Sequence, residues 1–338
     1  MRPIVFFVAA LLGVALAATP STAEEGRVLL VGPDQPLHSP SEAARAVHDG
    51  DTVKIEPGEY FDCAAWSANH LTIEGMGAGV VITDRTCQGK ALFITRGQDI
   101  TIRNITFARA RVPDGNGAGI RGEGGDLTVE GSTFTNNEVA ILVGDIPGAA
   151  VRITGSVFTG NGRCRDAHCL GTVMVGEIGT LRINNATFQG DTGGDIVVSH
   201  AHASHLSGNS FKDTATQAHL LSFADVADLS VDHNSLETGP SIKSNPRAAI
   251  FLGFSRFDNG TLSFSHNHVS DSGRGGLTFV LNWTGNSVRF DDNTFTGDIS
   301  ETSSSGRVSH WLYYDFLKFK DGIRHIVGSV LRALHLTR

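Results

Sequence analysis

The segment "LRINNATF", residues 181–188, carries the pattern on which the fold depends. Leu181, Arg182 and Ile183 alternate apolar, polar and apolar, which is the periodicity of a β-strand with one buried face. A turn follows, and a large apolar residue, Phe188, ends the segment. We therefore expect the first, third and last positions to be buried, and the second and fourth to face outward.

The same eight-residue word recurs along the chain, and its copies align with one another without gaps. An earlier fragment, LTIEG at 71–75, looks like a degenerate first copy. A chance alignment of eight words is hard to credit, so we interpret them as an internal structural repeat. The other words are ITIRNITF (100–107), LTVEGSTF (127–134), VRITGSVF (151–158), SHLSGNSF (204–211), LSVDHNSL (229–236), LSFSHNHV (262–269) and VRFDDNTF (288–295).

Stacking the words on one another gives two columns of like residues. Stacked asparagines at a bend can hydrogen-bond to one another and satisfy backbone groups that the bend would leave unpaired. The asparagine column contains Asn209, Asn234, Asn267 and Asn293, and the apolar column contains Phe107, Phe134, Phe158, Phe188, Phe211, Leu236, Val269 and Phe295.

A second set of short apolar segments lies between the words. With two or three short strands per repeat and no helix between them, the chain cannot form βαβ units. The pattern instead predicts an all-β fold, a parallel β-solenoid over 51–300, in which each coil lies ~4.8 Å from the one before. The second segments are 139–144, 172–177, 195–200, 249–254 and 276–281.

Each end of the repeat has helical features. Residues 40–50, within an N-terminal segment at 24–50, have the composition of a short helix with a serine cap, which would cover the open edge of the first coil. In the C-terminal tail, 301–338, residues 321–338 predict an amphipathic helix. We expect that helix to cap the last coil or to pack along an apolar flank, and contact with a membrane surface is the alternative.

The N-terminus predicts export. Residues 1–23 have a positive start, an apolar run and small residues before Ala18 and Ala23, which is the layout of a secretory signal peptide. An uncleaved anchor is the alternative. We expect a mature protein that is periplasmic or extracellular.

In an exported chain, an even cysteine count indicates disulfides. We favour Cys63–Cys87 and Cys164–Cys169, while other pairings and a four-cysteine zinc site stay open. The formal charge of −8 argues against a partner of one class, nucleic acid, whose phosphates require a basic face.

A helix followed by GDTVKIEPGEY, residues 50–60, together with the repeat, resembles right-handed parallel β-helix proteins of the pectate-lyase-like superfamily. The resemblance covers about residues 40–300 and implies the fold. The superfamily includes polysaccharide lyases, glycoside hydrolases, uronan epimerases and tail-spike adhesins, so the resemblance does not fix the activity.

The outward second positions of three consecutive words are basic: Arg152, Arg182 and His205. Consecutive coils would place them in a row at ~4.8 Å steps, roughly the repeat of a saccharide unit. Because an arginine fork can bind both oxygens of a carboxylate, we expect this row to bind an acidic polysaccharide. A solvated sheet face without a function is the alternative.

A lyase or epimerase of acidic sugars needs a base and a cation that offsets the developing charge. No cofactor is evident in the sequence, and calcium is one that this chemistry allows. The candidates are Asp195, His200 and His219 for catalysis, with Lys243 and Arg247 for substrate binding.

Two other groups of residues give weaker indications of a metal site or a catalytic site. His200, His202 and His205 have H-x-H-x-x-H spacing, but this spacing crosses an element boundary, so we expect no metal site there. Asp292, beside Asp291, occupies the bend position of its word, so turn chemistry explains it better than a catalytic carboxylate pair.

The resemblance also bears on whether this chain keeps an active site of similar proteins. Similar exported bacterial proteins have Cys-Ala-His-Gly-Ile-Tyr in place of CLGTVM (169–174), and Gly-His-x-Ile-Lys-Ser-Arg-Ala in place of GDIVVSHA (194–201). The basic and aromatic cluster that this implies is replaced here at Gly171, Met174, Asp195 and Val198, and only His200 keeps a basic ring.

Two functions therefore stay open. One is a carbohydrate-active β-helix of lyase or epimerase type that binds or modifies an acidic polysaccharide. The other is a non-catalytic polysaccharide-binding or envelope scaffold with a degenerate active site. A glycoside hydrolase is a weaker hypothesis, because the sequence shows no evident pair of carboxylates that would face each other across a groove.

Overall fold

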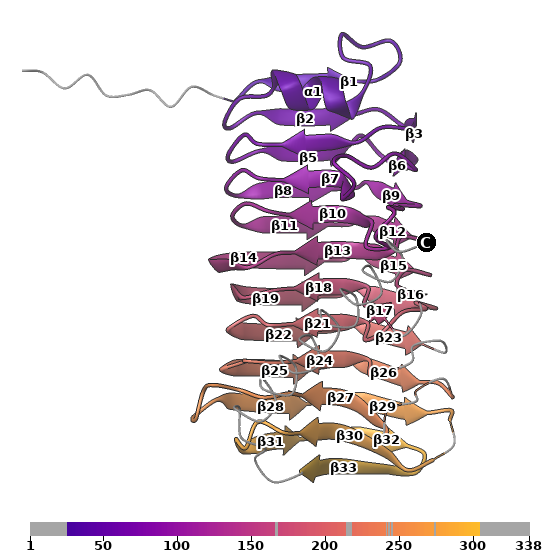
Figure 1. Cartoon of the computed structure of the whole chain (residues 1–338), viewed down its shortest axis with the longest axis vertical. Helices are drawn as coiled ribbons and strands as arrows, with labels where there is room; N and C mark the ends of the chain where they lie inside the picture. The colour runs from indigo at the N-terminus through magenta and orange to yellow at the C-terminus, as the bar shows by residue number, and fades with distance from the viewer. Residues whose placement is uncertain are drawn as a thin grey trace, which may run out of the picture.

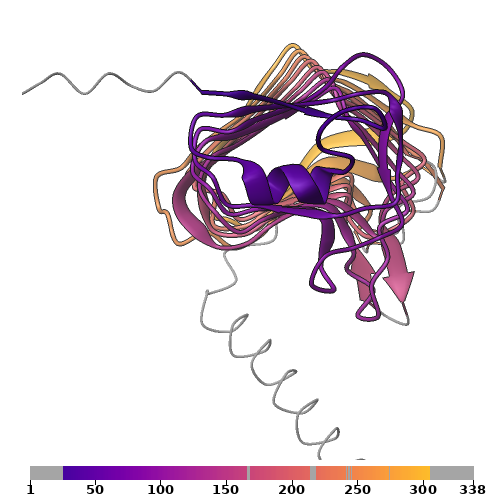
Figure 2. The ribbon, with the colours of Figure 1, turned by 90° about the horizontal axis from the view of Figure 1, so that it is seen from above.

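The computed structural model describes residues 26–165, 168–213, 218–240, 242, 244, 246–273 and 275–304. The chain forms a parallel β-solenoid in which each coil lies on the one before it (Figure 1). Three parallel sheets form its sides, and the view along the axis shows them enclosing one continuous core (Figure 2). The predicted all-β solenoid is confirmed.

The three sheets are named here by the strands that compose them. Sheet A contains β1 (Val28–Val31), β2 (Thr52–Ile55), β5 (Thr72–Gly75), β8 (Ile100–Arg103), β11 (Leu127–Glu130), β14 (Ile146–Thr154), β19 (Ile178–Asn184), β22 (Ala203–Ser207), β25 (Asp228–Asp232), β28 (Thr261–Ser265) and β31 (Val288–Asp291). Sheet B contains β3 (Gly58–Tyr60), β6 (Val80–Thr83), β9 (Thr106–Ala108), β12 (Thr133–Thr135), β15 (Val157–Thr159), β20 (Thr187–Gln189), β23 (Ser210–Asp213), β26 (Ser235–Thr238), β29 (His268–Asp271) and β32 (Thr294–Thr296). Sheet C contains β4 (Ala64–Trp66), β7 (Ala91–Thr95), β10 (Ala118–Gly122), β13 (Val139–Val143), β18 (Val173–Val175), β21 (Val197–Ser199), β24 (Leu221–Phe223), β27 (Ala248–Leu252), β30 (Leu277–Asn282) and β33 (Ile299–Ser304).

The eight-residue words form the corner between sheets A and B. Each word supplies one strand of sheet A, a bend and one strand of sheet B, so that Leu181 and Ile183 are buried while Arg182 faces outward. The words pair in register, as the partners Phe158 and Phe188 illustrate. The rings of these two residues stack with centroids 4.4 Å apart, within a stack that runs from Phe107 to Phe211. Both predicted columns are thus present.

The asparagine column forms a hydrogen-bonded ladder inside this corner. Asn234 Oδ1 accepts bonds from the backbone N–H and the side-chain amide of Asn209, each at 2.9 Å. Asn267 and Asn293 repeat the same bonds on the next two coils. The preceding bend residue has a left-handed backbone, with φ of 54° at His233. The ladder therefore satisfies polar groups that the bend buries.

A second ladder, which the sequence reading missed, lies where sheet B turns toward sheet C. Asn161 Oδ1 accepts bonds from the backbone N–H and side-chain amide of Asn137, and Asp191 Oδ1 accepts equivalent bonds from Asn161. All three residues are buried. These three positions lie outside the eight-residue words, in connections of unequal length, so their alignment is not evident in linear order.

The N-terminal end differs from the predicted boundary. Strand β1 pairs in register with β2, so sheet A begins before residue 51. Helix α1 (Pro40–Ala46) starts after Ser39, whose hydroxyl accepts a bond from the backbone N–H of Glu42. Figure 2 shows α1 lying across the N-terminal end of the solenoid, where its Ala43 is buried.

Two of the predicted features lie outside the residues that the structure describes. The signal peptide at 1–23 and the amphipathic helix at 321–338 both lie outside them. In the part of the chain that the structure describes, no helix has the length and apolarity of a membrane span.

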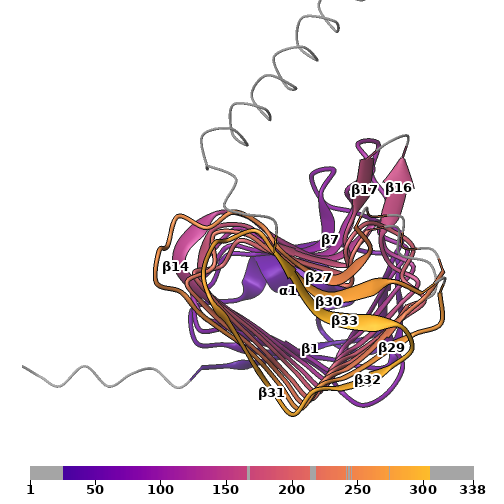
Figure 3. The ribbon, with the colours of Figure 1, turned by 90° about the horizontal axis from the view of Figure 1, so that it is seen from below.

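Both favoured disulfides, Cys63–Cys87 and Cys164–Cys169, are confirmed. The second closes the hairpin of β16 (Arg163–Arg165) and β17 (His168–Leu170), which projects from the body of the solenoid (Figure 3). Disulfides of this kind persist in oxidising compartments, which supports a periplasmic or extracellular protein.

Removal of one ladder residue tests the role of the corner. We expect Asn234→Ala to lower the free energy of unfolding by about 3 kcal/mol, because it leaves the buried N–H groups of Asn209 without an acceptor. Denaturant unfolding measures the change. The control is Asn184→Ala on the outward side of β19, which we expect to change stability by less than about 0.5 kcal/mol. Equal effects of the two substitutions would contradict the ladder's role.

Candidate functional site

The predicted basic row is present on the outward side of sheet A. Arg152 pairs in register with Arg182, and Arg182 pairs with His205, so the three side chains follow one another at strand spacing. Arg152 is half-exposed and forms an ion pair of 3.3 Å with Asp126. Arg182 is exposed and makes no ion pair with any of the described residues. Within the described part of the chain, the guanidinium at the centre of the row is therefore available to a ligand.

His205 forms the more enclosed end of this row. Its Nδ1 lies 2.9 Å from Ser230 Oγ, and its Nε2 lies 4.0 Å from an oxygen of Asp228. Partial burial and the positive charge of Arg182 hold the pKa of His205 below its ordinary value, against the opposite effect of Asp228. His205 is thus held in its neutral form near neutral pH, while the arginines carry the positive charge of the row.

Two of the three catalytic candidates, Asp195 and His219, meet just before the sheet C strands β21 and β24. Asp195 Oδ1 accepts a 2.7 Å bond from the backbone N–H of His219 and lies 3.2 Å from its Nδ1. The pair is mostly buried, with side-chain exposures of 16% and 14%. The ring of His219 stacks on Phe251 with centroids 5.2 Å apart, and Trp283 packs edge-on against Phe251. Because the carboxylate fixes the ring, this arrangement is that of an oriented imidazole beside an aromatic surface.

The third candidate, His200, follows strand β21, whereas Asp195 precedes it. It is five residues from Asp195 across β21, which corresponds to roughly 16 Å along an extended strand. His200 is exposed and lines a corner hollow of about 330 Å³ between sheets C and A, together with His202. The structure therefore does not bring His200 to the Asp195–His219 pair.

The corner hollow has mixed charge. Arg256 approaches Glu177 at 3.1 Å and Asp225 at 3.8 Å, and its backbone N–H donates to Asp225. The ring of His202 packs edge-on against Phe257, with centroids 4.8 Å apart. Since His205 lies outside the hollow on sheet A, the three histidines of the H-x-H-x-x-H pattern occupy two different surfaces.

Two cationic residues of the later coils, Arg247 and Lys243, are predicted from the sequence to bind substrate. Arg247 donates to both oxygens of Asp271, at 2.9 and 3.2 Å, and to the carbonyl of Gly275, and its side chain is only 16% exposed. This guanidinium is engaged inside the fold, so we do not include it in a binding surface. Lys243 lies outside the described residues.

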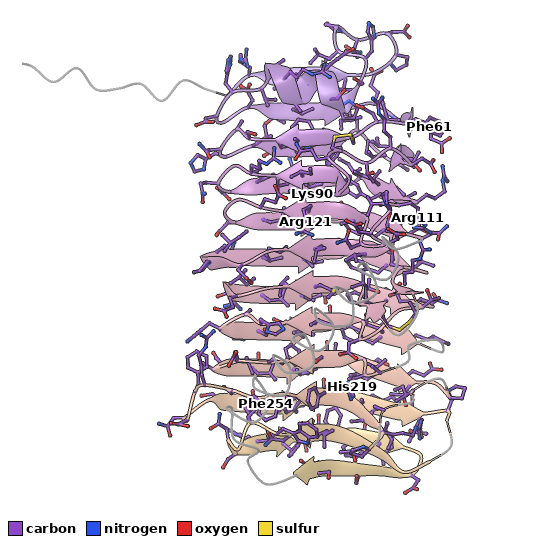
Figure 4. The ribbon with its side chains drawn as sticks, viewed as in Figure 1. Phe61, Lys90, Arg111, Arg121, His219 and Phe254 are labelled. Carbon is purple, nitrogen blue, oxygen red and sulfur yellow. A yellow bond between two sulfur atoms is a disulfide. The ribbon has the colours of Figure 1, made fainter. Side chains whose placement is uncertain are left out.

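Arg121 is a residue of sheet C that the sequence reading missed. It faces outward from β10 between its register partners Ile94 and Leu142, and its buried Nε finds no hydrogen-bond partner among the described residues. Figure 4 shows Arg121 on the upper part of the solenoid and His219 further toward the C-terminal end. A charged residue within the otherwise apolar segment at 118–122 was the available signal.

The register of sheet C settles which side chains of these strands face outward. Val197 and Leu221 are buried in the core, whereas Met174, Val198 and Phe251 are partly exposed. The outward positions near Asp195 are thus largely apolar.

Calcium binds through six to eight oxygens. Among the described residues, the groups of three or more potential metal ligands do not include Asp195. The residues present do not fit a calcium site at this pair, and we derive no step through that ion.

Asp292 has a left-handed backbone with φ of 46°, as do His233 and Gly131 at the same position of other words. Turn geometry therefore explains Asp292, as expected. Its neighbour Asp291 pairs in register with Ser265 on sheet A.

The fold and these surfaces can be compared with known proteins. The family model described as "Right handed beta helix region" matches residues 58–211 and 91–295, and the chain belongs to this family. A search of curated proteins finds none that matches the sequence.

Solved structures match the chain at low sequence identity, and the first of them shares its fold. A pectate lyase has a TM-score of 0.56 at 13% identity, over 84% of this chain and 81% of that one. A pectin methylesterase from carrot has a TM-score of 0.48 at 13% identity, over 80% of this chain and 90% of that one. An alginate lyase has a TM-score of 0.48 at 16% identity, over 85% of this chain and 41% of that one.

The coupling within the basic row can be tested by titration. We expect Arg182→Ala to raise the pKa of His205 toward its ordinary value, because it removes a neighbouring positive charge. NMR titration of the His205 ring measures the shift, and Arg152→Ala, one coil further away, is the control. An unchanged pKa in Arg182→Ala would contradict the coupling.

The sign of the pH effect on stability follows from the same shift. The folded pKa of His205 is lower than the unfolded one, so the unfolded chain takes up this proton first as the pH falls. The contribution of His205 to stability therefore decreases below about pH 6.5. Arg182→Ala should weaken this dependence.

Proposed function

We propose that this protein is an exported β-helix that binds an acidic polysaccharide along sheet A. The observation that carries the proposal is the in-register row of Arg152, Arg182 and His205 on an outward sheet face. A linear glycan with a carboxylate on each unit has a repeat close to the coil spacing of ~4.8 Å, so adjacent rungs can contact adjacent sugars. Arg182 would form the central contact, because its fork has no ion-pair partner among the described residues.

The flat surface suits a chain better than a small molecule. The row extends along the solenoid axis, while Asp126 beside Arg152 and Asp228 beside His205 lie at its two ends. These carboxylates would repel further acidic units, so the surface favours a short run of acidic sugars. Electrostatic contacts at an exposed surface weaken with salt, and the binding should do the same.

A specific observation favours a second candidate, a lyase or epimerase acting on the same class of polymer. The Asp195–His219 pair orients an imidazole beside Phe251, and an oriented imidazole can remove the proton next to a sugar carboxylate. Loss of the glycosidic oxygen would then complete an elimination, and return of a proton to the opposite face would complete an epimerisation. A pectate lyase shares this fold, which supports the substrate class.

Binding is our first candidate, because the surroundings of the imidazole are incomplete for this chemistry. Arg247, the predicted cation on the neighbouring strand layer, is engaged by Asp271. Met174 and Val198 are apolar at positions where the resemblance implies a tyrosine and a lysine. A scaffold that retains polysaccharide binding after the site has changed accounts for these residues.

Two finer features belong to the same proposal. We place the mature protein in the periplasm or outside the cell, in agreement with its two disulfides. We also assign α1 the role of covering the first coil, which protects an edge that would otherwise pair with other strands.

Binding can be tested with one substitution and a charge-matched control. We expect Arg182→Ala to raise the Kd for a uronate polysaccharide about fivefold, the effect of losing roughly 1 kcal/mol at an exposed charged contact. Affinity electrophoresis in polyuronate gels measures the change. Arg289→Ala removes the same charge from the same sheet, beyond two serine rungs, and should bind as the wild type does. Equal binding by wild type and Arg182→Ala would contradict the proposal that this row binds the polysaccharide.

Catalysis has its own test. Incubation with uronate polysaccharides, with and without calcium, should release unsaturated product that absorbs ultraviolet light if the chain is a lyase, and NMR of the polymer reports epimerisation. In either case we expect His219→Gln to lower the rate by about 10²-fold or more, whereas His200→Gln should leave it unchanged. Absence of both products from the wild type would leave the binding function alone.

A further inference from the structure

A cluster of two histidines and one aspartate lies on the corner between sheets A and B, at the opposite end of β25 from Asp228. Asp232 ends β25, His233 occupies the following bend, and His266 occupies the bend of the next coil. The ligand atoms of these three side chains all lie within 4.8 Å of one another. The proposed function uses none of them.

The carboxylate holds both rings in place. Asp232 Oδ2 lies 2.7 Å from Nδ1 of His233, and Oδ1 lies 3.1 Å from Nδ1 of His266. The two rings stack with centroids 4.5 Å apart, and Ser265 Oγ donates a 2.7 Å bond to Asp232. Both Nδ1 atoms are therefore directed at one carboxylate.

The charge and exposure of the cluster suit a metal ion. Partial burial raises the pKa of the Asp232 carboxyl, but hydrogen bonds from Ser265, His233 and His266 outweigh burial and place the pKa below its ordinary value. The carboxylate is thus ionised at neutral pH. The side chains of His233 and His266 are 62% and 44% exposed, so an ion can reach them from solvent.

The geometry points to a binding site for a first-row transition metal ion, which we propose to be formed by Asp232, His233 and His266. Imidazole nitrogen and carboxylate oxygen are ligands that Zn²⁺, Cu²⁺ and Ni²⁺ accept. In a tetrahedral zinc site with bonds of about 2.0–2.1 Å, neighbouring ligand atoms lie about 3.3 Å apart. The observed separations of 2.7 and 3.1 Å run to different oxygens of the Asp232 carboxylate, so the side chains must adjust to place both Nδ1 atoms and one oxygen around a single ion, and water completes the coordination.

The protons balance without an external partner. In the free protein each ring donates a hydrogen bond from its Nδ1–H group to the Asp232 carboxylate. On binding, that proton moves through solvent to the exposed Nε2 of the same ring, and the Nδ1 lone pair coordinates the ion. The ion thereby takes the place of the two hydrogen-bonded protons.

The site would connect two coils that are far apart in sequence. Their words begin at residues 229 and 262, the longest interval between successive words in the chain. Binding to the folded chain alone stabilises it by mass action, so the metal acts as a clip across this corner. Sequence reading missed the cluster because its residues come from two repeats and their outward bend positions align only in the coil.

The experiment uses the purified mature chain and Zn²⁺ as the probe. We expect isothermal titration calorimetry to give one site per chain, and the Tm to rise in Zn²⁺ and return to the metal-free value with EDTA. Co²⁺ should show the visible bands of a low-coordinate site with nitrogen and oxygen ligands. Ca²⁺, which requires oxygen ligands, should not raise the Tm.

Asparagine substitutions test the assignment without disturbing the bend. Asn185 occupies the equivalent position with φ of 52°, so His233→Asn and His266→Asn keep a residue that accepts this backbone. Each should weaken Zn²⁺ binding at least about tenfold, since the loss of even an outer partner costs about 10–100-fold. The metal-free Tm of each variant shows that the fold is intact.

His70→Asn provides the matched control. His70 also has a left-handed backbone and an exposed aspartate partner, Asp99, but it belongs to no group of three potential metal ligands among the described residues. This variant should bind Zn²⁺ as the wild type does. Unchanged Zn²⁺ binding in His266→Asn, or equal losses in His266→Asn and His70→Asn, would overturn the proposal.

Discussion

The structure depends on the hydrogen-bonded bend between sheets A and B. Asn234, Asn267 and Asn293 each accept bonds from the backbone and side chain of the asparagine on the preceding coil, which fixes the register at which these coils meet. A shift by one residue would leave these buried groups unpaired and turn each strand to its other face. The stacked phenylalanines follow from the same register, since Phe188 and Phe211 each come three residues after the left-handed bend residue of their word, Asn185 or Gly208.

Fixed register converts a linear repeat into rows of side chains along the solenoid axis. A position that changes little from word to word produces a uniform column, as in the core. A position that is free to vary produces a surface whose chemistry changes in ~4.8 Å steps. The basic row on sheet A and the histidine corner at Asp232 are two results of this one property. Function in such a protein is distributed over coils and is not concentrated in one loop.

The contrast between the two candidate functions has a physical basis. Polysaccharide binding needs polar and charged groups at a regular spacing, which the repeat supplies through the arginines Arg152 and Arg182 and the neighbouring His205. Proton transfer needs several groups around one atom, and the layer of sheet C places His200 and His219 at opposite ends of its short strands. Only Asp195 and His219, which come from consecutive coils, are brought together.

The sequence by itself determined the solenoid, the two columns and the basic row, because each depends on periodicity. It favoured the two disulfides, whose cysteines are close in sequence, but left other pairings open. The tertiary structure decided the surroundings of individual residues. It engaged Arg247 with Asp271, aligned Asn137 with Asn161, and brought His266 to Asp232. These contacts cross connections of unequal length, and their register is fixed only when the coils stack. Periodicity specifies which face a side chain occupies, and stacking specifies what it meets there.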